Sequence, residues 1–155
     1  MTVDFDLIDD LSERMEQATD EERMAEVIKH FPRFKIRYQK LTQGKDKYGS
    51  YNRYQVTVTN NEQVYRYTFN DSIANTYNNT MSSDFCILHC AVLDAGCYEY
   101  NDSLQDFADN FGYDLWEDRK RAEKAFNGCK TAYESMIRLF GAEGYRTLQA
   151  IGTNY

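Results

Sequence analysis

The feature that most limits the fold of this chain is a change in the spacing of its apolar residues at Arg33. Before Arg33, apolar residues recur every three or four positions, which is typical of amphipathic helices. Between Phe34 and Phe69 they alternate with polar residues, as in strands that bury one face. The helical spacing returns after Asn70. These zones predict an α+β fold with acidic N-terminal helices, a three-stranded antiparallel sheet and a C-terminal helical bundle.

The length of the chain fits a single domain. Its 155 residues can bury a core without disulfide bonds, and 42% of them are hydrophobic. We therefore expect one domain over residues 1–155, made of an acidic helical segment (1–32), a β-meander (33–70) and a helical part (71–155).

The N-terminal zone is expected to form two short helices, or one bent helix, that end before Pro32. Its apolar residues fall into two sets, within residues 5–15 and 24–31. Between these sets, Thr19 and Glu22 have the spacing of a capping box, in which each side chain accepts a hydrogen bond from a free backbone N–H at the start of a helix. A helix is therefore expected to begin at this point.

The alternating zone predicts a meander of three strands, at residues 33–38, 53–58 and 64–69. One face of this sheet is apolar and aromatic. The opposite face is expected to lack aromatic residues, so bases cannot stack there, but its clustered cations leave phosphate contact open. The cations expected on this face are Lys35, Arg37, Arg53 and Arg66.

The turn between the second and third strands is expected at Asn60 and Asn61, because asparagine tolerates the positive φ of a two-residue hairpin turn. This turn places Val56 opposite Tyr65 on the apolar face.

The segment FCILHCAVLDAG, residues 85–96, is apolar nearly all round. This composition predicts a buried helix, ended by Gly96, whose residues from Phe85 to Leu93 form the centre of the core.

The same segment contains a possible metal site, because positions i, i+3 and i+4 place three donors on one helix face. Structural zinc sites usually take paired ligands from two separate knuckles, however, and cysteine is among the most buried residue types. We therefore predict that no metal or cofactor binds here and that the four candidate ligands are core residues. These are Cys86, His89, Cys90 and Cys97.

The segment DNFGYDLWED, residues 109–118, is either a corner between two helices or a partner-binding site. As a corner it would stop one helix, insert an aromatic residue and start the next. As a site it would expose Tyr113 and Trp116 as aromatic anchors. The sequence predicts a short helix that begins at a capping box of Asp102 and Gln105 and ends at Gly112. It also predicts a long helix that begins at a second capping box, of Asp114 and Glu117, and ends at Gly141.

The net charge of −7 is unevenly distributed. Residues 1–32 hold ten acidic and three basic residues, residues 33–69 hold two and eight, and residues 70–155 hold thirteen and seven. Such asymmetry indicates an interaction surface. The alternative is that the acidic N-terminal segment folds over the basic one.

The sequence offers little catalytic chemistry. Nucleotide-binding glycine motifs, the serine hydrolase elbow and the zinc protease motif are all missing. The sequence allows a nucleophilic pair of Cys97 and His30, but nothing in it favours such a pair over burial of these residues in the core. We expect a protein that is not an enzyme. Because no apolar run approaches the ~20 residues of a membrane span and the N-terminus is acidic, we also expect a cytoplasmic protein with reduced thiols.

Residues 84–141 resemble a family of small proteins from temperate phages and other mobile elements. The resemblance rests on FCILHCAVLDAG followed by LQDFADNFGYDLWEDRKRAEKAFNGCKTAYESMIRLFG. The shared pattern is a buried helix ending in Asp-Ala, then Phe-Gly-Tyr-Asp, a charged turn and a long helix ending in Leu-Phe. This chain departs from the pattern at Leu104 and at residues 115–118. The resemblance implies a genomic context but supplies no catalytic residues.

Two functions remain under consideration. In the first, the protein is a non-enzymatic inhibitor of a host defence nuclease, an RNA-guided one, and resembles anti-CRISPR proteins in size, acidity and genomic setting. Its acidic side chains would then occupy a basic nucleic-acid channel. The partner-binding residues expected for this function are Asp4, Asp6, Asp9, Asp10, Glu13 and Glu16, with Tyr113 and Trp116.

In the second, the protein is an accessory nucleic-acid-binding protein of phage replication or recombination. The cations Lys35, Arg37, Arg53 and Arg66 would then contact phosphates. The negative net charge favours the first function, because it repels nucleic acid at long range and attracts a basic nuclease.

Overall fold

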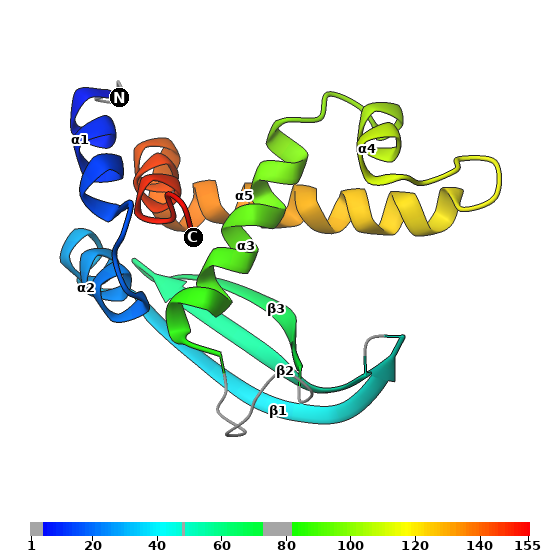
Figure 1. Ribbon diagram of the computed structural model, residues 1–155, viewed down its shortest axis with the longest axis horizontal. Coiled ribbons are helices and arrows are strands. Elements are labelled where there is room, and N and C mark those ends of the chain that lie inside the picture. Colours follow the sequence, from blue (N-terminus) through cyan, green and yellow to red (C-terminus); the bar gives the residue numbers. More distant parts are fainter. Residues whose placement is uncertain (1–4, 48, 73–81) are drawn as a thin grey trace.

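The chain folds into helices, a three-stranded sheet and a second set of helices, so the predicted α+β class is confirmed (Figure 1). The computed structural model describes residues 5–47, 49–72 and 82–155, and Asp4 lies outside them. The elements are α1 (Phe5–Met15), α2 (Asp20–His30), β1 (Lys35–Asp46), β2 (Gly49–Asn60), β3 (Gln63–Ser72), α3 (Asp84–Glu99), α4 (Leu104–Phe111) and α5 (Arg119–Ile151).

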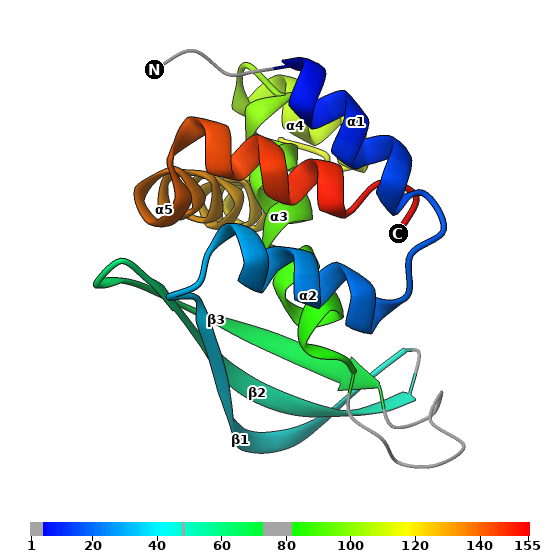
Figure 2. The ribbon, with the colours of Figure 1, turned by 90° about the vertical axis from the view of Figure 1, so that its left-hand side faces the viewer.

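The helices lie on one side of the sheet, and the described residues place no helix over its other face (Figure 2). Helices α3 and α5 cross above the inner face, and α1 packs beside the last turns of α5 (Figure 1). The core fills the space between these layers and contains Val56 from β2, Leu88 from α3, and Met136 and Leu148 from α5.

The capping box predicted between the two N-terminal helices is confirmed. The Thr19 hydroxyl accepts a hydrogen bond from the Glu22 backbone N–H, and the Glu22 carboxylate accepts one from the Thr19 N–H. Two separate helices therefore form, and α2 ends before Pro32.

The strands pair in the order β1-β2-β3, and all are antiparallel and longer than predicted. The predicted turn is wrong by one residue, and the predicted pairing of β2 with β3 is wrong by two residues. Asn61 and Glu62 have positive φ and form the turn, so Val56 lies opposite Tyr67. The cause is Asn60, whose buried side-chain amide donates to the Leu139 carbonyl at 2.9 Å and is thereby held in β2. The shift is two positions in pairing, so each side chain keeps its predicted face.

Helix α3 is longer than predicted and only part of it is buried. It begins after Ser83, whose hydroxyl accepts from the Cys86 N–H, and it passes through Gly96 to Glu99. The predicted end at Gly96 is wrong, because this glycine stays helical and its carbonyl accepts from the N–H of Tyr100. Leu93, expected in the core, is 56% exposed because the described structure leaves that face of α3 uncovered.

The corner between α4 and α5 is confirmed in outline, but its caps differ from the prediction. Ser103 rather than Asp102 caps α4, by accepting from the Asp106 N–H. Gly112 ends α4 in the left-handed conformation, as predicted. The second box does not form, because the Asp114 carboxylate accepts from the Trp116 N–H in a local turn and α5 begins only at Arg119.

The long helix α5 is broken at Gly141, where φ is 75° and ψ is 169°. The predicted end of the helix is therefore correct for its first segment. The chain then resumes a helical path to Ile151, and this second segment places Tyr145, Leu148 and Ile151 in the core beside α1.

Candidate functional site

The acidic residues of α1, together with Glu16 just after its end, form a stripe on its outer side, which we call the acidic stripe. The opposite side of α1 buries Leu11 and Met15, so the orientation of the helix is fixed by its apolar residues. All carboxylates of the stripe are consequently turned to solvent. They are Asp6, Asp9, Asp10, Glu13 and Glu16.

Helix α1 is held by two polar contacts near its C-terminal end. Its Ser12 hydroxyl is hydrogen-bonded to the hydroxyl of Thr153, and the Arg14 guanidinium donates to the Glu26 carboxylate of α2 at 3.1 Å. Arg14 is thus directed to α2 and does not neutralise the acidic stripe. The stripe is therefore a rigid row of negative charge.

The four predicted cations share the uncovered outer face of the sheet, which we call the basic face. Arg37 and Arg66 flank Thr57 in one row across the three strands. A shallow hollow of about 210 Å³ lies between them and is also lined by Gln39 and Gln55. All four cations are exposed, and none forms an ion pair within the described residues. They are Lys35, Arg37, Arg53 and Arg66.

The expectation that this face lacks aromatic residues is wrong. Because β2 extends back to Gly49, strand alternation places Tyr51 on the same face as Arg53. The Tyr51 ring lies against Gly44 of β1, where a Cβ atom would be 2.3 Å from the ring. The basic face thus has one aromatic ring near its end.

The acidic stripe and the basic face lie at opposite ends of the molecule, as both views show (Figures 1 and 2). The acidic segment of residues 1–32 therefore does not cover the basic face, because α1 lies away from the sheet and α2 lies on its helical side (Figure 2). The two predicted surfaces are separate, and each faces solvent.

The structure does not combine Tyr113 and Trp116 into one aromatic anchor. Tyr113 is half-buried, stacks on Phe107 with 5.9 Å between ring centroids, and lies under the Arg121 guanidinium. Trp116 is 97% exposed. Both belong to the corner between α4 and α5, on the far side of the molecule from α1 (Figure 1).

The histidine and cysteines of α3 are packed with other side chains. His89 is buried and forms a cluster of three mutually contacting rings with Phe85 and Tyr155. Cys86, Cys90 and Cys97 are partly rather than fully buried, and burial raises the pKa of Cys90 to about 11. Within the part of the chain that the structure describes, no group of three His, Cys, Asp or Glu side chains is placed to hold a metal ion.

The possible nucleophilic pair of Cys97 and His30 is not formed. His30 lies 3.3 Å from the Glu26 carboxylate, whereas the Cys97 thiol contacts that of Cys129 in α5. Burial raises the pKa of both thiols, to about 12 for Cys129. These thiols are therefore protonated at neutral pH and poorly nucleophilic.

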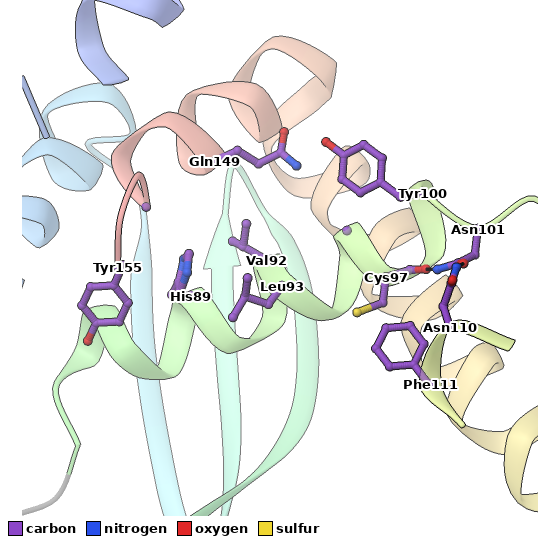
Figure 3. A pocket seen from close by; sticks show the side chains of 12 residues that line it. His89, Val92, Leu93, Cys97, Tyr100, Asn101, Asn110, Phe111, Gln149 and Tyr155 are labelled. Carbon is purple, nitrogen blue, oxygen red and sulfur yellow. Dashed lines mark hydrogen bonds between the residues drawn. The ribbon is translucent and has the colours of Figure 1, made fainter. Parts of the chain in front are cut away.

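Sequence reasoning missed an apolar pocket of about 590 Å³ beside α3, which we call the α3 pocket (Figure 3). One exposed face of α3 forms its floor. The end of α4 and the last residues of the chain form its sides. One feature of the sequence indicated such a pocket. Residues 85–96 are apolar nearly all round, so a face of this helix that the rest of the described chain leaves open is apolar as well. Its walls include His89, Val92, Leu93, Cys97, Phe111 and Tyr155.

Comparisons of the chain with protein-family models, with curated proteins and with solved structures found no match. Among the described helices, even the 33 residues of α5 do not combine the length and apolar composition of a membrane span.

Proposed function

We propose that the protein is a non-enzymatic phage or mobile-element protein that inhibits a host defence nuclease in the host cytoplasm. In this proposal the acidic stripe enters a basic channel that otherwise holds nucleic acid. The observation that carries the proposal is the stripe itself, because its carboxylates are exposed on a helix whose other side is fixed in the core.

The charge spacing of the stripe is close to that of a nucleic-acid strand. A helix rises about 1.5 Å per residue, so Asp6 and Glu13 of α1 are about 10 Å apart along the axis. Four carboxylates occupy this length, those of Asp6, Asp9, Asp10 and Glu13. The spacing is thus about 3.5 Å per charge, compared with about 3.4 Å per phosphate along one DNA strand. A channel lined by cations for phosphates therefore suits this stripe.

The stripe is also rigid before binding. Leu11 and Met15 fix its helix to the core, and Arg14 links it to α2. A rigid surface loses little conformational entropy on association, which favours tight binding. RNA-guided nucleases are the partner class that we propose, because they hold their heteroduplex in a positively charged channel.

The non-enzymatic part of the proposal is supported by the state of the nucleophiles. The thiols of Cys90, Cys97 and Cys129 have raised pKa values, and His30 contacts a carboxylate rather than a thiol.

Reversing the charge of the stripe is expected to slow association with the nuclease about ten-fold at low salt, because opposite charges accelerate encounter. The variant carries Asp9→Lys, Asp10→Lys, Glu13→Lys and Glu16→Lys. Quantitative mass spectrometry after a pull-down from host lysate identifies the nuclease, and surface plasmon resonance then gives the association rate. The difference from wild type should shrink as salt rises, since the Debye length is about 8 Å at physiological ionic strength.

A control variant makes the same change in net charge elsewhere. It carries four reversals of exposed residues outside α1, namely Asp102→Lys, Asp109→Lys, Glu117→Lys and Glu134→Lys. This control should associate nearly as fast as wild type. Equal slowing by the two variants would show that only net charge matters and would reject the stripe as the binding surface.

A second candidate function is nucleic-acid binding through the basic face. It is favoured because the four exposed cations form no ion pair with any residue that the structure describes. If the inhibitor proposal is right, a gel-shift titration with single- and double-stranded DNA at low salt should show no micromolar binding. Micromolar binding that is removed by changing Arg37 and Arg66 to glutamine, but not by reversing the acidic stripe, would favour the second candidate. Its affinity should also fall steeply with salt, because phosphate contacts release counterions.

A further inference from the structure

We propose that the α3 pocket binds an elongated, uncharged and largely apolar small molecule, with His89 as its hydrogen-bonding partner. The pocket belongs to a different part of the molecule from the acidic stripe, so this inference does not rest on the proposed function.

The size and shape of the pocket fit such a ligand. Its volume of about 590 Å³ lies within the range of about 300–1,000 Å³ that is usual for small-molecule sites. Its floor follows one face of α3 from His89 to Tyr100, which is about 16 Å along the helix at 1.5 Å per residue. Figure 3 shows Tyr155 and His89 at one end and Phe111 at the other. An elongated molecule can therefore lie along α3.

Large apolar side chains are left in water around this pocket. Leu93, Tyr100, Phe111 and Tyr155 are all exposed, and all four line it. Such a grouping of exposed apolar surface marks a binding site more often than a chance arrangement. Covering these side chains removes apolar area from water and so favours an apolar ligand.

His89 supplies a polar atom that has no partner in the protein. The side chain is 8% exposed, and its Nδ1 atom is buried without a hydrogen bond in the described structure. Burial, followed by the nearby charge of Arg23, lowers the pKa of His89, so the imidazole is neutral at neutral pH. A neutral imidazole has one donor and one acceptor nitrogen. Gly152 packs against this edge of the ring, so a ligand with a single N–H or O–H group satisfies Nδ1 when the last residues of the chain move aside.

Several of the remaining polar atoms of the pocket are already engaged. The Asn101 amide donates to the Cys97 carbonyl, and the Asn110 amide donates to the Asn101 side-chain oxygen. The Gln149 oxygen accepts from Arg146. The lining contains no carboxylate, lysine or arginine side chain. The site therefore suits a neutral ligand, with a polar contact at the His89 end.

The test uses the full chain and N-phenyl-1-naphthylamine, a neutral fluorophore with one N–H group. Its emission rises in apolar surroundings, so a titration gives the affinity directly. We expect one saturable site with a micromolar Kd. The variant Leu93→Glu should weaken binding at least ten-fold, because it places a charge in the wall, while the fold is retained because Leu93 is exposed.

The matched control is Leu41→Glu, which makes the same change at an exposed leucine of β1 and should leave the Kd unchanged. A third variant, His89→Phe, keeps an aromatic ring but removes the nitrogens, and should weaken binding about five-fold. Circular dichroism checks that each variant is folded. Saturating probe should also raise the Tm of wild type, since a ligand that binds only the folded state stabilises it.

Three results would overturn the proposal. One is the absence of saturable binding to wild type. Another is equal affinity of the wild type and the Leu93→Glu variant. The third is displacement of the probe by the captured nuclease, which would assign the pocket to protein docking. Unchanged affinity in His89→Phe would overturn the role of the histidine. The titration of the protein alone with the probe contains no nuclease, so a failure to bind the probe leaves the stripe experiment unaffected.

Discussion

Replacing Arg23 with methionine is expected to lower the free energy of unfolding by about 3 kcal/mol, because a charged hydrogen bond contributes about 1.5–3 kcal/mol and a buried carbonyl without a partner costs about 1–3 kcal/mol. Arg23 is 2% exposed. Its guanidinium donates to the carbonyls of Ile151 and Thr153 at 2.6 and 2.8 Å, and to that of Ala18. Ile151 is the last residue of α5, where helix carbonyls have no partner in the helix itself, and Thr153 follows just after it.

Urea denaturation of the full chain measures this loss. Arg23→Lys should give an intermediate value, because an ammonium group keeps the charge but lacks the planar fork that reaches several acceptors. Lys29→Met removes a charge from an exposed position of the same helix and should change stability by less than about 0.5 kcal/mol. A loss for Arg23→Met no larger than that for Lys29→Met would show that the buried guanidinium does not hold the two ends of the chain together.

Replacing Gly141 with alanine is expected to cost about 3 kcal/mol of stability, because φ near 75° with ψ near 169° is accessible almost only to glycine. A Cβ atom there would meet no atom within 4 Å, so the effect comes from the backbone alone. Relief of the strain requires α5 to straighten. A straight helix would carry Tyr145, Leu148 and Ile151 away from α1 and expose them.

Gly128→Ala is the control for this experiment, since it makes the same change in the same helix at a site that also has open space around it. Alanine favours a helix over glycine by about 1 kcal/mol, so this variant should be slightly more stable than wild type. Denaturation midpoints in urea distinguish the two outcomes. If both variants were stabilised, Gly141 would not be the residue that sets the direction of the last helical segment.

The order of helices and strands could be predicted because each element buries its own apolar pattern. Details that depend on distant contacts could not. The turn after β2 moved because Asn60 bonds a carbonyl 79 positions away, which local turn preference does not reveal. The cap of α4 moved by one residue because Asp102 and Ser103 are both good caps and sequence alone cannot rank them.

The candidate sites also differ in how much of each could be predicted from the sequence. The acidic stripe could be predicted, because exposure of Asp9 and Glu13 follows from burial of Leu11 and Met15 on the same helix. The basic face could be predicted from strand alternation, apart from Tyr51. The α3 pocket could not, because its walls come from three segments that only the tertiary structure brings together.

The bonds from Arg23 to Ile151 and Thr153 also constrain when the protein can fold during synthesis. The partners of Arg23 are separated from it by up to 130 positions. At about 5–20 residues per second, a ribosome needs roughly 6 to 26 s to make that length. During this time α1, which packs against α5, cannot bury Leu11 and Met15 against its native neighbour, whereas neighbouring strands of the meander can already pair. Helix α1 is thus made first and is among the last elements to reach its native contacts.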